Sequence, residues 1–384
     1  MSQSLRVLIV EDSELDARVL AALLQSGGYT VQSVRVETAQ EMSRALTEGV
    51  WDVILADYNL PAFNAPDALA LLRRTQIDVP FIVISGGIGE DLAVRIMKSG
   101  AQDYLMKGAL ARLVPAVERE VREARERASH RQAEEALHAA REQVRIAREI
   151  QQRLFPAAPP SLPGFDLAGL SQPADETGGD YFDFIPMPGN TVGLVVGDVT
   201  GHGLGPALLM AETRAYLRIL AQQSSDVGQI LTHANRVLAQ DVGSERYVTL
   251  LLAQLDPLTR TVCYANAGHG PGLCLDRTNR VRCELGRTQL PLGVRADTQY
   301  AAAVPVVLEP DDVLVLMTDG VEESLSESQE LFGRERVLEV LGAQRAQPAC
   351  VMADLLHRAA RTHIGSLDQP DDYTTIILKV LEKG

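Results

Sequence analysis

The feature that most constrains the fold is a central segment, from Ala116 to Phe155, that contains no glycine and no proline. Apolar residues recur three and four places apart, and most of the positions between them are arginine or glutamate. This pattern predicts a long amphipathic helix over 116–155 with a narrow apolar seam. A second copy could cover the seam in a coiled coil, and a solvated single helix is the alternative. The seam residues are Val114, Val117, Val121, Ala124 and Ala128, then, after a phase break near Ala133, Leu137, Ala140, Val144, Ala147, Ile150 and Leu154.

Before this helix, residues 5–115 alternate short apolar runs with helical patterns. Buried strands are expected at 5–10, 53–56, 81–84 and 104–106. Strands that alternate with helices predict parallel βαβ units, in a doubly wound sheet covered by helices on both faces. Ligand sites in such α/β sheets lie beyond the carboxyl ends of the strands.

Polar side chains follow each of these four strands. Glu11 and Asp12 follow the first strand, Asp57 the second, Ser85 the third and Lys107 the fourth. They are expected at one edge of the sheet, where clustered carboxylates repel unless a hard cation such as Mg²⁺ neutralises them. A carboxylate there could accept a phosphoryl group, with a hydroxyl and an ammonium to hold its oxygens. Any one of these residues alone would be read as a solvated loop residue.

These segments resemble the receiver domain of bacterial response regulators, over about residues 4–125. The resemblance implies that Asp57 is the phosphoacceptor and that a sensor histidine kinase or phosphotransfer protein is the partner. It also implies that one Mg²⁺ is held by Glu11, Asp12, Asp57 and the carbonyl of Asn59. Ser85 and Lys107 would contact the phosphoryl group, and Tyr104 would be the aromatic switch. The matching motifs are Val10-Glu11-Asp12-Ser13, Ala56-Asp57-Tyr58-Asn59-Leu60-Pro61, Ile84-Ser85-Gly86 and Asp103-Tyr104-Leu105-Met106-Lys107.

The region after the helix is rich in strands. The prolines of Pro156-Ala157-Ala158-Pro159-Pro160 end the helix, and the strand-rich pattern begins at Phe165. Such a mixture predicts an α/β sandwich of antiparallel sheets flanked by helices, over 156–384. Strands are expected at 192–196, 248–255, 261–265, 304–308, 313–317 and 374–380, and helices at about 205–221, 226–240, 334–342 and 348–363.

Four acidic motifs are spread through this region, each beside an apolar strand or a glycine turn. Converging carboxylates make an oxygen-rich site for Mg²⁺ or Mn²⁺, and two such ions can orient a hydroxide for in-line attack on a phosphate ester. An ordinary Asp-Gly turn is the alternative for any single motif. The motifs are Gly178-Gly179-Asp180-Tyr181-Phe182-Asp183, Gly197-Asp198-Val199-Thr200-Gly201-His202-Gly203, Thr318-Asp319-Gly320 and Asp371-Asp372-Tyr373-Thr374-Thr375.

Over about residues 145–382 the chain resembles the metal-dependent serine/threonine phosphatases of the PP2C superfamily, in particular the sporulation and stress-response branch. The resemblance implies two Mn²⁺ or Mg²⁺ ions. Their ligands would be the catalytic acids Asp180, Asp198, Asp319 and Asp371, with the Val199 carbonyl as a further ligand. It also implies a phosphoserine or phosphothreonine protein as substrate, most plausibly a STAS-type anti-sigma-factor antagonist. His202 could be a general acid or a loop residue, and His269 is expected to make a structural hydrogen bond.

Composition narrows the range of possible binding partners and cellular locations. The formal net charge of −15 disfavours binding to nucleic acid or an anionic membrane, which argues against a DNA-binding regulator. No apolar run approaches the length needed to span a bilayer, and four scattered cysteines suit a reduced, cytoplasmic compartment. The sequence therefore predicts a response regulator with a phosphatase as output, dimeric through the central helix. The competing prediction is a phosphatase-like domain that has lost catalysis and sequesters a partner.

Overall fold

The computed structural model describes residues 3–61, 63–87, 90–201, 203–243 and 246–382. The chain divides into two compact units, Met1–Ala139 and Ala140–Gly384, and each is described by itself. His202, one of the candidates above, lies outside the described residues.

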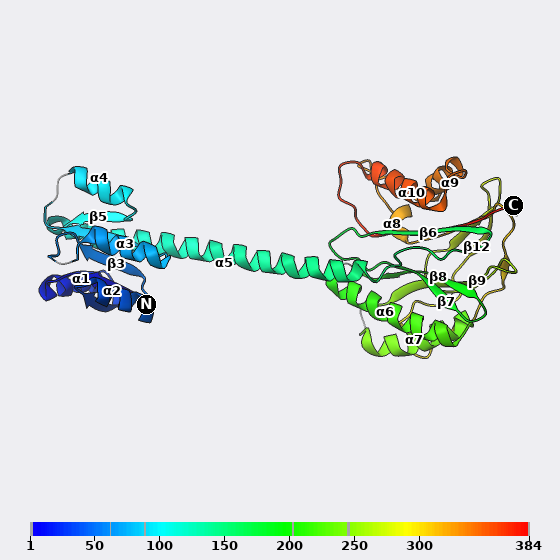
Figure 1. Cartoon of the computed structure of the whole chain (residues 1–384), viewed down its shortest axis with the longest axis horizontal. Coiled ribbons are helices and arrows are strands. Elements are labelled where there is room, and N and C mark those ends of the chain that lie inside the picture. Colours follow the sequence, from blue (N-terminus) through cyan, green and yellow to red (C-terminus); the bar gives the residue numbers. More distant parts are fainter. Residues whose placement is uncertain (1–2, 62, 88–89, 202, 244–245, 383–384) are drawn as a thin grey trace. The chain divides into compact units, whose positions relative to one another are not determined.

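The first unit is built on a parallel five-stranded sheet with the order β2-β1-β3-β4-β5 (Figure 1). Strands β3 and β4 are buried over their whole length, because helices cover both faces of the sheet. The elements are β1 (Gln3–Val10), α1 (Glu14–Ser26), β2 (Tyr29–Val36), α2 (Ala39–Glu48), β3 (Val53–Asp57), α3 (Ala65–Thr75), β4 (Phe81–Ser85), α4 (Glu90–Lys98), β5 (Asp103–Met106) and a 3₁₀ turn (Lys107–Arg112).

Two helices of this unit begin with the same cap beside the carboxyl edge of the sheet. The Ser13 side chain accepts a hydrogen bond from the backbone N–H of Asp16 and begins α1. The Asn64 side chain accepts the equivalent bond from Asp67 and begins α3. These caps satisfy backbone donors that the helices leave free.

Helix α5 (Leu113–Gln152) is the predicted central helix, and it begins three residues before the predicted boundary. Pro115 is tolerated because the N–H groups of the first turn have no partner inside a helix. The first turns belong to the core of the first unit, where Val117 and Val121 are buried. The part of the seam at these two residues therefore does not form a free surface. Farther along, Leu137 is 52% exposed and Ile150 is 58% exposed.

The second unit is a sandwich of two five-stranded sheets, with the orders β13-β10-β9-β8-β7 and β12-β11-β14-β15-β6. One apolar cluster fills the space between the sheets. Helices α6 and α7 cover the outer face of the first sheet, and α8, α9 and α10 that of the second (Figure 1). The strands are β6 (Phe165–Gln172), β7 (Tyr181–Met187), β8 (Thr191–Val199), β9 (Val248–Asp256), β10 (Thr261–Ala267), β11 (Gly272–Leu275), β12 (Val281–Leu285), β13 (Val306–Val307), β14 (Val313–Met317) and β15 (Tyr373–Val380). The helices are α6 (Leu204–Gln223), α7 (Val227–Asp241), α8 (Asp319–Glu322), α9 (Gly333–Ala343) and α10 (Ala349–Ile364).

The predicted fold class is confirmed for both units. The strand expected at 304–308 is shorter than predicted, since only Val306 and Val307 pair with β10. None of the helices among the described residues is long and apolar enough to cross a membrane.

A glutamate substitution should destabilise the protein more at a buried position of α5 than at an exposed one. Val121→Glu would bury an unpaired carboxylate in the core, so we expect it to lower the free energy of unfolding of the first unit by at least about 2 kcal/mol. In the monomeric chain, Leu137→Glu should change this free energy by less than about 0.5 kcal/mol because the side chain is exposed there. Urea unfolding followed by the fluorescence of Trp51, the sole tryptophan, measures both variants. Equal stability of the two variants would contradict the assignment of Val121 to the core.

Candidate functional sites

The first site lies at the carboxyl edge of the parallel sheet, where β1 and β3 end side by side. Glu11, Asp12 and Asp57 bring one carboxylate oxygen each to within 4.8 Å of one another. Glu11 is buried, and burial, helped by neighbouring acids, raises its pKa to about 7. A hard divalent cation suits this set of oxygens, and the residues fit the predicted Mg²⁺ site.

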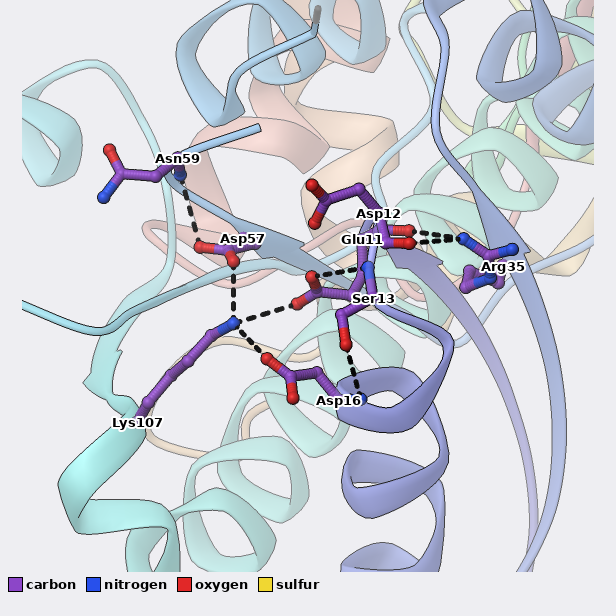
Figure 2. A network of polar contacts seen from close by, with 8 residues as sticks. All are labelled: Glu11, Asp12, Ser13, Asp16, Arg35, Asp57, Asn59 and Lys107. Carbon is purple, nitrogen blue, oxygen red and sulfur yellow. Dashed lines mark hydrogen bonds and ion pairs between the residues drawn. The ribbon is translucent and has the colours of Figure 1, made fainter. Parts of the chain in front are cut away.

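A single ammonium group joins two of these acids, Glu11 and Asp57 (Figure 2). Nζ of Lys107 lies 2.7 Å from Oδ2 of Asp57 and 3.2 Å from Oε2 of Glu11. Although burial opposes it, hydrogen bonds to the carboxylates raise the pKa of Lys107 above its ordinary value. The lysine therefore stays charged beside the predicted phosphoacceptor.

The other predicted residues of this site lie in the loop after β3 and on the neighbouring strands β4 and β5. The backbone N–H of Asn59 donates to Oδ1 of Asp57 at 3.2 Å, which fixes the start of the loop after β3. Ser85 is fully buried at the end of β4, and its hydroxyl has no hydrogen-bond partner in the part of the chain described. The hydroxyl of Tyr104, on β5, is also buried without a partner there. A buried, unpaired hydroxyl beside a carboxylate fits a site that receives phosphoryl oxygens.

Two residues of this network were not predicted. Nη1 of Arg35, at the end of β2, donates to the backbone carbonyls of Glu11 and Asp12, both at 3.1 Å. Oδ2 of Asp16, in the first turn of α1, lies 2.5 Å from Nζ of Lys107 (Figure 2). Arg35 lies in a strand that our sequence analysis did not identify, and Asp16 looks like an ordinary acid of a first helical turn.

The second site is assembled from both sheets of the sandwich. In the first sheet, Asp180 directly precedes β7 and Asp198 lies near the end of the antiparallel neighbour β8. In the second sheet, Asp319 follows β14 and Asp371 precedes the antiparallel neighbour β15. In an antiparallel pair one strand starts where the other ends, so each sheet contributes its two acids at one end.

Hydrogen bonds across the sandwich hold these acids together. The hydroxyl of Thr318 donates to Oδ2 of Asp180 at 2.7 Å, which joins the end of β14 to the start of β7. Oδ2 of Asp372 accepts from the backbone N–H of Asp180 at 3.2 Å, and Oδ1 accepts from that of Ala174 at 2.8 Å. Asp372, which belongs to the fourth acidic motif, thus acts as a support for Asp180.

The electrostatics indicate that these carboxylates lie near enough to raise one another's pKa values. Burial, followed by the charges of Asp198 and Asp372, raises the pKa of Asp180 well above its ordinary value. Burial raises the pKa of Asp198 to about 7, and the charges of Asp319 and Asp371 add to this effect. Such mutual repulsion disappears when divalent cations bind, and oxygen donors of this kind are those that Mg²⁺ and Mn²⁺ prefer.

Two glycines permit this close arrangement. A Cβ at Gly178 would lie 2.2 Å from Oδ2 of Asp372, and a Cβ at Gly179 would lie 2.6 Å from the carbonyl oxygen of Val199. Any side chain at either position would push apart the acids or the predicted carbonyl ligand. An open pocket beside them is lined by Asp198, Gly201, Gln369 and Asp371, among others.

His269 is a structural residue, as expected. Its Nε2 lies 3.1 Å from the carbonyl of Met317, and its Nδ1 lies 2.9 Å from the hydroxyl of Thr249, whose backbone pairs with Asp198. Burial lowers the pKa of His269 to about 4, so the ring is neutral at pH 7. It therefore donates to the carbonyl through Nε2 and accepts from Thr249, and it links the strands that carry Asp198 and Asp319.

The end of helix α5 contacts the second site directly. The side chain of Gln151, which is 7% exposed, donates to the carbonyl of Gly178 at 2.6 Å and accepts from its N–H at 3.2 Å. Gly178 lies two residues before Asp180 and packs against Asp372. The position of the helix end is thus coupled to the backbone that presents Asp180.

Comparison with protein families matches residues 188–381 to Stage II sporulation protein E (SpoIIE) and residues 7–118 to the response regulator receiver domain. The chain is 29% identical over 186 residues to the phosphoserine phosphatase RsbU of Bacillus subtilis, a match covering 48% of this chain and 55% of RsbU. It is 25% identical over 256 residues to protein IcfG of Synechocystis, covering 60% of this chain and 40% of IcfG. These matches span about half the length of either relative.

The fold of the second unit is also found in a solved structure. The PP2C domain of SiaA from Pseudomonas aeruginosa superposes with a TM-score of 0.56 at 23% identity, covering 64% of this chain and 98% of that one. At this level of identity the likeness concerns the fold, an antiparallel sandwich of the PP2C type with its helices.

The two hydrogen bonds between Gln151 and Gly178 form a clamp, which can be tested by replacing Gln151 and the neighbouring Gln152. Gln151→Ala should remove both hydrogen bonds, loosen the segment before Asp180 and weaken Mn²⁺ binding to the second site by about tenfold, since each lost buried bond costs about 1 kcal/mol. Gln152→Ala is the matched control, because that side chain is exposed. Calorimetric titration with Mn²⁺ measures both. Equal Mn²⁺ affinities in the two variants would show that the clamp does not support the site.

Proposed function

The chain belongs to the SpoIIE family and carries a response regulator receiver domain, and on this premise we propose that it is a metal-dependent serine/threonine phosphatase controlled by phosphorylation of Asp57. The observation that carries the proposal is the set of acids that both sheets contribute at one end, with Asp180 buried, Asp198 partly buried and Asp371 exposed. Desolvation, followed by the charges of neighbouring acids, raises the pKa of each of these three. A purely structural role would leave such repulsion uncompensated.

The roles of the individual residues follow from their placement. Asp180, Asp198, Asp319 and Asp371 would hold two Mn²⁺ or Mg²⁺ ions, with the Val199 carbonyl as a further ligand. Ions bound there supply positive charge to a phosphate ester and lower the pKa of a water molecule. Thr318 and Asp372 keep Asp180 in place through hydrogen bonds. The open pocket at Asp198 and Asp371 lets an exposed phosphorylated side chain of a protein reach the acids.

The proposed substrate is a protein carrying phosphoserine or phosphothreonine. Support comes from the similarity to RsbU, a phosphoserine phosphatase. Within this class we propose a phosphorylated STAS-type anti-sigma-factor antagonist. On the input side, a receiver domain requires a phosphodonor, which we propose to be a sensor histidine kinase or a phosphotransfer protein. All of these partners suit a cytoplasmic protein.

Helix α5 is the proposed connection between input and output. Its first turns are part of the receiver core, and its last turn holds Gly178 through Gln151. Between them, the exposed Leu137 and Ile150 offer an apolar surface that a second copy of the helix would bury in a homodimer. A change in the pairing of the helices would then reach the backbone at Asp180.

The alternative is a catalytically weak domain that binds a phosphoprotein without hydrolysing it. Phosphate release from a phosphoprotein, measured in the presence of Mn²⁺, separates the enzyme from the binding module. A binding module would retain the phosphoprotein in the presence of Mn²⁺ without releasing phosphate, whereas an enzyme releases phosphate continuously.

We expect hydrolysis of a phosphoserine protein to require Mn²⁺ or Mg²⁺ and to stop on chelation. Asp198→Asn or Asp319→Asn removes a charged ligand, and each should lower turnover at least ~10²-fold, the scale of losing one electrostatic stabiliser. Phosphate release at saturating substrate measures turnover. Asp297→Asn, which alters an exposed acid outside the site, is the control. Wild-type turnover in both ligand variants would falsify the site assignment.

A further inference from the structure

Lys107 has one carboxylate partner that lies outside the predicted metal site. Its three ammonium hydrogens face three acids, with Nζ 2.5 Å from Asp16, 2.7 Å from Asp57 and 3.2 Å from Glu11. Glu11 and Asp57 belong to the acid triad that fits Mg²⁺, whereas Asp16 does not. The shortest of the three contacts is therefore made to the acid that plays no part in holding the metal.

The local fold holds Asp16 in this position. Asp16 occupies the third position after the cap of α1, and its backbone N–H is bound by Ser13. Its side chain lies beside Lys107 in the network of Figure 2 and is 39% exposed, compared with 9% for Asp57. The carboxylate of Asp16 thus remains partly solvated while it holds the ammonium beside α1.

We propose that Asp16 is a positioning residue, whose carboxylate holds the Lys107 ammonium against α1 and so restrains its transfer to a phosphoryl group on Asp57. This inference rests on the proposed role of Asp57 as phosphoacceptor. An ammonium has three donors, and the three acids occupy all of them, so a new phosphoryl partner must displace one.

The step concerned is ordinary acyl-phosphate exchange. With acetyl phosphate as donor, a carboxylate oxygen of Asp57 bonds to phosphorus while the bond between phosphorus and the acetate oxygen breaks, and acetate leaves with the electron pair. The developing charge on the phosphoryl oxygens attracts the Lys107 ammonium toward them, and the ion pair with Asp16 opposes this displacement.

The test compares two acids at equivalent helical positions. Asp16→Asn keeps size and hydrogen bonding but removes the charge, and it should raise the rate of Asp57 labelling by acetyl phosphate and Mg²⁺ about two- to fivefold, the scale of a partly exposed ion pair. Beryllium fluoride, a phosphoryl analogue that binds without a chemical step, should bind more tightly by the same factor. Asp67→Asn is the matched control, since Asp67 is also third after its cap and its N–H is bound by Asn64.

A second comparison asks whether Asp16 acts through the lysine. In a Lys107→Gln background, Asp16→Asn should leave the labelling rate and the beryllium fluoride affinity unchanged. A similar gain with and without Lys107, or slower labelling of Asp16→Asn and Asp16→Ala in a chain that unfolds at the wild-type temperature, would overturn the proposal. Absence of labelling at Asp57 in the wild-type chain would instead contradict the proposed function.

Discussion

The repulsion among clustered carboxylates is the constraint on which the second unit depends. The two sheets contribute Asp180, Asp198 and Asp371, and burial together with neighbouring acids raises the pKa of each of these three. Hydrogen bonds from Thr318 and to Asp372 hold Asp180 against this repulsion and join one sheet to the other. The same bonds that close the sandwich therefore build an oxygen-rich site, which only a cation can neutralise fully.

Carboxylates also repel one another in the receiver, but an ion-paired side chain offsets the repulsion there. There a lysine lies among the acids and offsets part of their charge before any metal binds. The ammonium is held by side-chain contacts alone, whereas the hydrogen bonds at Asp180 involve the backbone and close glycine contacts. The arrangement suits a switch in the first unit and a rigid site in the second.

Much of this could be predicted from the sequence, because strands and glycine turns mark the acids of both sites. Contacts between distant side chains could not be predicted. The clamp of Gln151 on Gly178 joins residues 27 positions apart, and the pairing of Lys107 with Asp16 spans 91 positions. Nor could burial within the seam be predicted, since Val121 and Leu137 follow the same spacing but only Val121 meets the receiver core. Such distinctions arise from tertiary packing, which overrides a local pattern.

The most direct test of the whole account is the rate of phosphate release from a phosphoserine protein, measured with and without acetyl phosphate in wild type and in Asp57→Asn. Phosphorylation of Asp57 should change the wild-type rate at least about fivefold, the lower range of typical coupling between sites, and should leave the rate of the variant unchanged. Equal wild-type rates, in a chain shown by mass spectrometry to be phosphorylated at Asp57, would contradict the claim that the receiver controls the phosphatase.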